Sequence, residues 1–224
     1  MKPKQIPGIP KHTGGGYHDT ESNKCFESKE RALEEFDLLK RRFLNINRWK
    51  EYAGKGSASF RLYDIEGKPV ERIPVQGDYI RIDIPGPGTM EAGGFDWVQV
   101  KKISNQFLKE NEEENLLIEC SPSVDPTQPD AVNIAHFYHK NATSTFMISR
   151  SANCICACIY GRNERPNFKN APMPDKLRNG LIAVSGMIGL SKIEWKALIE
   201  GLLNFSGTSG YKKCTALALI AIVI

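Results

Sequence analysis

Three cysteines at every second position, Cys154, Cys156 and Cys158, form the densest group of reactive side chains in the sequence. Thiolates can bind zinc or take part in redox chemistry. In a β-strand, however, residues two apart are separated by about 7 Å, whereas two thiolates on one tetrahedral zinc ion are separated by about 4 Å. Reduced cysteine is also a normal buried residue. We therefore predict that these thiols pack in the core and bind no metal.

Histidine and carboxylate side chains offer a second kind of chemistry. His136 and His139 stand three residues apart and would share one face of a helix, as metal ligands do. The segment leads into a predicted strand and has no third ligand nearby, so we predict no metal site. Asp96, His136 and Arg162 are the candidates for an enzyme of unknown class. Motifs for serine hydrolases, phosphate-binding loops, dinucleotide binding and zinc proteases are absent, so we expect no cofactor and rank catalysis last.

A dense polar segment at residues 161–167 could bind an anion or a protein partner. Its candidate contacts are Arg162, Asn163 and Arg165, because guanidinium groups bind carboxylates and phosphates with paired hydrogen bonds. A solvated connection without a binding role is the interpretation that we prefer for this segment. The whole chain has 30 basic and 26 acidic side chains, a net charge of only +4, and its aromatic and basic residues are not interleaved on a strand. We therefore predict no nucleic-acid binding.

The elements that would position these groups begin with an amphipathic helix. Ser28 suits the N-cap, and apolar residues follow at helical spacing, at Ala32, Phe36, Leu39, Phe43 and Ile46. The apolar period then changes to two, which is typical of strands. The six predicted strands cover residues 59–64, 79–84, 97–103, 116–120, 143–149 and 153–160.

Helical spacing returns near the C-terminus, over residues 175–189 and, after a capping box at Ser191 and Glu194, over residues 192–203. One kinked helix is the alternative. The last eleven residues, 214–224, are almost wholly apolar. A helix of that length would extend about 17 Å, against about 30 Å for the hydrocarbon core of a bilayer, so we predict no stable membrane span.

The composition, 41% hydrophobic and 25% charged, fits a folded domain. We predict a single α+β domain over residues 28–203, with an N-terminal helix, a curved and mostly antiparallel sheet of about six strands, and a C-terminal helical segment. Residues 1–27 are rich in Pro and Gly and predict a flexible arm without a strand, and 204–224 form an apolar tail whose role stays open. No secretory signal is visible, so we expect a cytoplasmic protein with all six cysteines reduced.

Four segments, NINRWKEYAG, GDYIRIDIPGPG, FDWVQV and YGRNERPN, resemble a set of uncharacterised bacterial hypothetical proteins. The resemblance spans residues of about 45–203 and implies no activity, cofactor or functional residue. The order of the elements is also similar to START-like helix-grip proteins, whose curved sheet and long helix enclose an apolar ligand cavity. This similarity implies a helix-grip fold, with a barrel or a simpler helix-on-sheet sandwich as alternatives.

The leading functional hypothesis is non-catalytic binding of a small apolar or lipid-like ligand between sheet and helix. The candidate lining residues are Phe60, Leu62, Ile80, Ile82, Trp97, Phe146 and Ile188. The same residues would equally form a filled core. The alternative is a protein-interaction or assembly module that uses the sheet edge, residues 161–167 or the second C-terminal helix.

Overall fold

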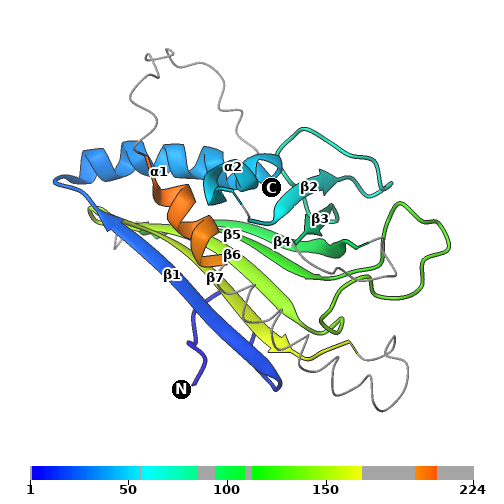
Figure 1. Ribbon diagram of the computed structural model, residues 1–224. Helices are drawn as coiled ribbons and strands as arrows, with labels where there is room; N and C mark the ends of the chain where they lie inside the picture. Colours follow the sequence, from blue (N-terminus) through cyan, green and yellow to red (C-terminus); the bar gives the residue numbers. More distant parts are fainter. Residues whose placement is uncertain (1, 56, 85–93, 109–112, 168–194, 206–224) are drawn as a thin grey trace.

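The architecture is one antiparallel sheet with helices packed on one of its faces (Figure 1). The computed structural model describes residues 2–55, 57–84, 94–108, 113–167 and 195–205. The seven described strands follow in the order β1-β7-β6-β5-β4-β3-β2, so β1 and β2 lie at opposite edges of the sheet. Their bounds are Gly16–Cys25 for β1, Ser59–Tyr63 for β2, Tyr79–Asp83 for β3, Asp96–Leu108 for β4, Glu113–Pro122 for β5, Thr143–Ser151 for β6 and Cys154–Glu164 for β7.

The predicted α+β class with an antiparallel sheet is confirmed. Each of the six predicted strands corresponds to one strand from β2 to β7. The difference is β1, which forms within the segment that was expected to be a flexible arm. Residues 16–25 are mostly polar, and they form a strand because they pair along the full edge of β7, from Gly16 opposite Glu164 to Cys25 opposite Cys154.

The predicted N-terminal helix is α1, Lys29–Leu44, and it lies across the sheet against β6 and β7 (Figure 1). The Ser28 hydroxyl accepts a hydrogen bond from the Arg31 N–H at 3.2 Å and so caps the first turn. The apolar stripe of α1 is buried on the sheet. A 3₁₀ turn, η1 at Ile46–Arg48, and the short helix α2, Trp49–Ala53, follow.

Residues 195–203 form a further helical segment, drawn in orange in Figure 1. They match the described part of the predicted helix 192–203, and their buried residues are Trp195, Leu198, Ile199, Leu202 and Leu203. Arg42 of α1 donates hydrogen bonds to the Leu202 and Asn204 carbonyl oxygens, at 3.1 and 2.8 Å, and satisfies the end of this helix. The predicted helix 175–189 and residues 206–224 of the tail lie outside the described residues.

We call the sheet face that packs against α1 and residues 195–203 the inner face. Its core contains aromatic rings in edge-to-face or tilted contact. The Trp49 centroid lies 4.9 Å from that of Phe146 and 5.2 Å from that of Phe60, and the Phe146 centroid lies 5.6 Å from that of Trp195. Such pairs add about 0.5–1.5 kcal/mol each beyond the burial of their area. No helix in the described part of the chain is long and apolar enough to cross a bilayer.

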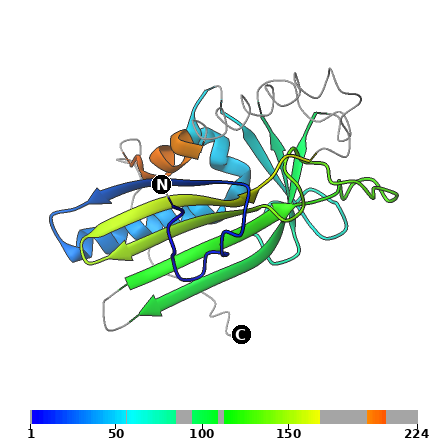
Figure 2. The same ribbon diagram turned by 90° about the horizontal axis from the view of Figure 1, so that it is seen from below.

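The N-terminal residues that precede β1 lie against the opposite, outer face of the sheet (Figure 2). Ile6 and Ile9 pack on a cluster formed by Leu117, Met147, Cys158 and Tyr160. The Arg162 guanidinium donates a hydrogen bond to the Lys4 carbonyl oxygen at 3.0 Å, and the Asn163 amide donates one to the Lys11 carbonyl at 3.2 Å. The segment is therefore held to the sheet by both apolar and polar contacts.

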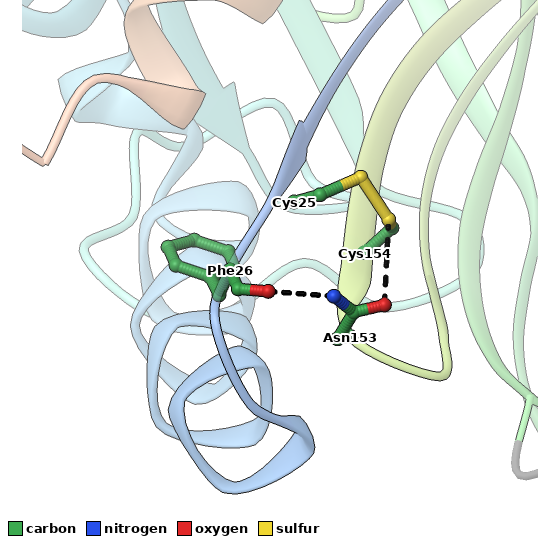
Figure 3. The surroundings of a disulfide bond; sticks show 4 residues. All are labelled: Cys25, Phe26, Asn153 and Cys154. Carbon is green, nitrogen blue, oxygen red and sulfur yellow. Dashed lines mark hydrogen bonds between the residues drawn. A yellow bond between two sulfur atoms is a disulfide. The ribbon is translucent and has the colours of Figure 1, made fainter.

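The expectation that every cysteine is reduced is wrong for Cys25 and Cys154, which form a disulfide (Figure 3). The unexpected strand β1 is the reason, because it places the two residues opposite each other with their Cα atoms 4.0 Å apart. Asn153 beside them donates a hydrogen bond to the Phe26 carbonyl oxygen at 2.6 Å (Figure 3). Cys156 and Cys158 are free thiols whose sulfur atoms lie 3.0 Å apart on the outer face.

We predict that the double variant Ile6→Ala, Ile9→Ala detaches the N-terminal segment. The free energy of unfolding in urea should fall by about 1–3 kcal/mol, because two half-buried side chains lose apolar contact. Site-resolved iodoacetamide labelling of Cys156 should become faster, since Ile6 and Ile9 pack in the same cluster. Gln5→Ala is the matched control, since Gln5 is exposed. Unchanged stability and labelling would show that the segment does not protect this face.

Candidate functional site

An irregularity near the end of β7 decides which side chains enter the interior. Asn163 has a positive φ of 56°, a conformation that asparagine tolerates better than most residues. The register between β1 and β7 shifts at the same place, between Gly16 and His18. This is the behaviour of a β-bulge, which re-aims the side chains beyond it. Arg162 therefore lies on the outer face, whereas Glu164 lies on the inner face.

The inward-facing Glu164 meets His18 of β1. The His18 Nδ1 lies 2.7 Å from Glu164 Oε1, and the two side chains are 5% and 3% exposed. Gly161 lies directly against both groups, and a Cβ atom there would overlap the Glu164 carboxylate and the His18 ring. The absence of a side chain at Gly161 is therefore what lets this buried pair form.

A connecting segment, residues 135–139, brings further polar groups to the same place. The backbone N–H of Trp97 donates a hydrogen bond to the Ala135 carbonyl oxygen at 2.8 Å, which joins the segment to β4. Beyond β7, the Asn167 N–H donates to the Phe137 carbonyl oxygen, also at 2.8 Å, and Tyr138 pairs with Pro166. Because the segment is held between β4 and the end of β7, His136 and Tyr138 enter the interior next to Glu164.

These groups surround an interior cavity on the inner face of the sheet. Its apolar lining consists of Ile82, Ile84, Val98, Phe137, Phe146 and Trp195, with the Cys120 thiol beside them. Its polar lining consists of Asp96, His136, Tyr138, Ser144 and Glu164. The space open to the centre of a water-sized sphere is about 20 Å³, which is enough for about one water molecule.

Asp96 is the least compensated ionisable group in this cavity. The residue is 3% exposed, and its carboxylate accepts one hydrogen bond, from the Phe137 N–H at 3.2 Å. No ion pair joins it to a basic group in the described chain. Burial raises the pKa of Asp96 from its ordinary 3.8 to about 7, against the smaller opposing effect of the Phe137 N–H. Such a perturbed carboxyl in a cavity is typical of functional sites.

The neighbouring His136 and Tyr138 are kept neutral by burial. Loss of hydration lowers the pKa of His136 to about 3. Its Nδ1 accepts a hydrogen bond from the Tyr138 N–H at 2.9 Å, so the neutral ring carries its proton on Nε2. Burial raises the pKa of Tyr138, and the Glu164 charge raises it further. The Tyr138 hydroxyl is buried without a well-formed hydrogen bond to any described residue.

Of the predicted lining residues, Ile82 and Phe146 reach the cavity. Phe60, Leu62 and Ile80 belong to the filled part of the inner core. Trp97 points to the outer face, where it packs on Tyr63 and Ala135, and its neighbour Val98 takes the inner position. Ile188 lies outside the described residues.

The predicted polar loop is largely strand, because β7 continues to Glu164. Arg162 is fully buried; its guanidinium donates to the Lys4, His18 and Gly161 carbonyl oxygens, and an ion pair at 2.7 Å joins it to Asp19. Arg165 is exposed. Two of the three candidates for catalysis, Asp96 and His136, meet in the cavity, whereas Arg162 does not.

Sequence reasoning missed His18, Tyr138 and Glu164. Their signal in the sequence was weak, because His18 and Glu164 stand in polar stretches and Tyr138 stands in a segment without a clear apolar period. The described residues contain no group of three or more His, Cys, Asp or Glu side chains placed to hold a metal ion.

Comparisons with known proteins give remote similarity in structure. A hypothetical protein from Helicobacter pylori is 9% identical, with a TM-score of 0.42 over 83% of this chain and 86% of that chain. The Zhui aromatase/cyclase from Streptomyces sp. R1128 is 9% identical, with a TM-score of 0.37 over 86% and 99%. Ara h 8.0201 is 12% identical, with a TM-score of 0.32 over 84% and 99%. No protein-family model and no curated protein matches the sequence. At these values the similarities carry no functional argument.

We predict that Asp96 makes the protein less stable as the pH rises from about 4 to about 7. The folded pKa, about 7, lies above the ordinary value of 3.8, so the folded state binds the extra proton in this range and loses that advantage as the pH rises. His136 acts in the opposite sense, because its folded pKa of about 3 lies below 6.5. Only the difference between the wild type and Asp96→Asn isolates the effect of Asp96.

The measurement is urea unfolding of both proteins near pH 4.5 and near pH 8. Asp96→Asn should gain about 3 kcal/mol relative to the wild type between the two conditions. Asp83→Asn makes the same charge change at an exposed position. Its free energy of unfolding should change with pH in the same way as that of the wild type. A difference between Asp96→Asn and the wild type that is independent of pH would contradict the assignment.

We also predict that Gly161→Ala separates His18 from Glu164, because the new methyl group occupies the space of both side chains. The loss of this buried contact should lower the free energy of unfolding by about 1–3 kcal/mol. The His18 ring resonances, followed by NMR, should lose the signature of the hydrogen bond. Gly16→Ala is the control, because its added Cβ would make only ordinary contacts with Glu164, and the His18 resonances should stay unchanged in this variant. Equal effects of the two variants on stability and on these resonances would contradict the prediction.

Proposed function

We propose that the interior cavity binds a small, mostly apolar ligand that carries one polar group. The observation that supports this most is the convergence of two under-satisfied buried groups, the Asp96 carboxyl and the Tyr138 hydroxyl, on one cavity whose other lining is mainly apolar. Few convergent polar groups in an apolar cavity are the usual arrangement of a small-molecule site.

The energetics favour a ligand that completes these interactions. A buried donor or acceptor without a partner costs about 1–3 kcal/mol, and a buried charge costs more. Among the described residues, this cost is offset only in part: Asp96 accepts one hydrogen bond, from the Phe137 N–H, and the Tyr138 hydroxyl has no well-formed one. A polar ligand group between them would recover part of it, and the apolar part of the ligand would lie against Ile82, Phe146 and Trp195.

The size of the cavity implies that the ligand enters by moving part of the lining. About 20 Å³ of open space does not accommodate an organic molecule. Most of the lining belongs to hydrogen-bonded strands, but Trp195 comes from the helical segment at residues 195–203, which lies on the sheet. We expect this segment to shift outward when the ligand binds. The protein-interaction and catalytic hypotheses stay predictions of the sequence.

The test uses the fluorescent apolar probe N-phenyl-1-naphthylamine with two matched variants of β6. Ser144→Leu fills the cavity and should weaken binding of the probe at least about tenfold. Ser149→Leu makes the same change on the outer face of the same strand and should bind like the wild type. Equal binding by all three proteins would place the probe elsewhere, and no binding by the wild type would favour a closed core.

A further inference from the structure

The charges around the interior cavity restrict the kind of ligand that fits. Among its described lining residues, two carry carboxyl groups, Asp96 and Glu164, and none is a lysine or arginine. The nearest guanidinium along β7 belongs to Arg162, which lies on the outer face and is occupied by Asp19 and three carbonyl oxygens.

The other titratable groups among the described lining residues do not supply positive charge. Burial lowers the pKa of His136, so the ring is neutral near pH 7. Burial raises the pKa of Cys120 and of Tyr138, so both keep their protons. His18 of β1 lies behind Glu164 and contacts that carboxylate at 2.7 Å. The Glu164 carboxylate thus lies against a His18 ring nitrogen, whereas Asp96 forms no ion pair with a described residue.

The aromatic part of the lining also favours a cation. Phe137, Phe146 and Trp195 line the same cavity as Asp96. The faces of such rings carry partial negative charge and attract ammonium groups by about 0.5–2 kcal/mol. Among the described lining residues, a carboxylate ligand would meet two acidic groups and these aromatic rings but no lysine or arginine, so electrostatics disfavour fatty acids and other anions here.

Resting on the proposed function, we propose that the ligand is an amine, with a compact apolar body against Phe146 and Trp195 and a protonated amino group paired with the Asp96 carboxylate. The ammonium group has three donors, and the Tyr138 hydroxyl can accept one of them. The pairing offsets the loss of hydration that both charges undergo in the interior.

The proposal makes affinity depend on pH in a defined direction. Below about pH 7 the Asp96 carboxyl holds a proton, and an ammonium ion must displace that proton in order to bind. Affinity for an amine should therefore rise at least about tenfold from about pH 5.5 to about pH 8, as long as the amine itself stays protonated. Affinity for a neutral analogue should not change in this way.

The experiment compares 2-phenylethylamine, 2-phenylethanol and phenylacetate, which share one aromatic body, by isothermal titration calorimetry with the full chain. We expect the amine to bind at least about tenfold more tightly than the alcohol at pH 8, and phenylacetate to bind most weakly. Near pH 6, amine binding should release a proton, measured as a dependence of the heat on the ionisation enthalpy of the buffer.

Two variants that each remove one carboxylate test whether Asp96 causes the preference for the amine and the proton release. Asp96→Asn should abolish both the preference for the amine and the proton release while 2-phenylethanol still binds. Asp83→Asn, at an exposed position, should retain both. If Asp96→Asn fails to fold, the release of a proton by the wild type, measured from the dependence of the binding heat on the buffer, tests the proposal by itself.

The outcomes separate this inference from the proposed function. If 2-phenylethanol binds and the amine shows no advantage and no proton release, the ligand class is wrong and the cavity still binds apolar molecules. If neither compound binds at either pH, the proposed function fails and this inference fails with it. An amine preference that survives in Asp96→Asn would overturn the role of Asp96.

Discussion

The β-bulge at Asn163 is the constraint on which both faces of the sheet depend. In a regular strand Arg162 and Glu164 would share one face, because side chains alternate with a period of two. The positive φ of Asn163 and the register shift against β1 separate them. Arg162 then holds the N-terminal segment on the outer face, and Glu164 joins His18 on the inner face. One local departure from strand geometry thus fixes the outer cover and the inner site together.

The inner face divides into a filled region and a polar end. Near α1 the rings of Trp49, Phe60 and Phe146 pack in edge-to-face and tilted contacts and leave little open space, which is the packing expected of a stable core. Toward Asp96 and residues 135–139 the packing gives way to polar groups with incomplete hydrogen bonding. Proteins keep such groups where they serve a function, since their burial lowers stability. The difference between the filled aromatic region and this polar end is the reason for placing the candidate site near Asp96.

The sequence predicts those parts of the fold that repeat with a clear period. The stripe that begins at Ala32 and the alternation around Ile80 correctly predict α1 and β3. The edge strand β1 could not be predicted, because it is polar on both sides and is defined by its pairing with β7; the Cys25–Cys154 disulfide depends on that pairing. Trp97 and Val98 are both apolar, so alternation alone could not show which one faces inward. The site depends on the bulge and on the segment at residues 135–139, whose positions are set by distant hydrogen bonds that leave no local pattern.

Asp96 is a buried carboxyl that forms no ion pair with any basic group in the described part of the chain. The most direct test is a pH titration of its side-chain carbon by ¹³C NMR on the full chain, with the resonance assigned by its loss in Asp96→Asn. Because burial raises the pKa of this carboxyl, we expect a midpoint near 7. A midpoint near the ordinary 3.8 would mean that the carboxylate is hydrated or paired. This result would contradict the role of Asp96 in the candidate site.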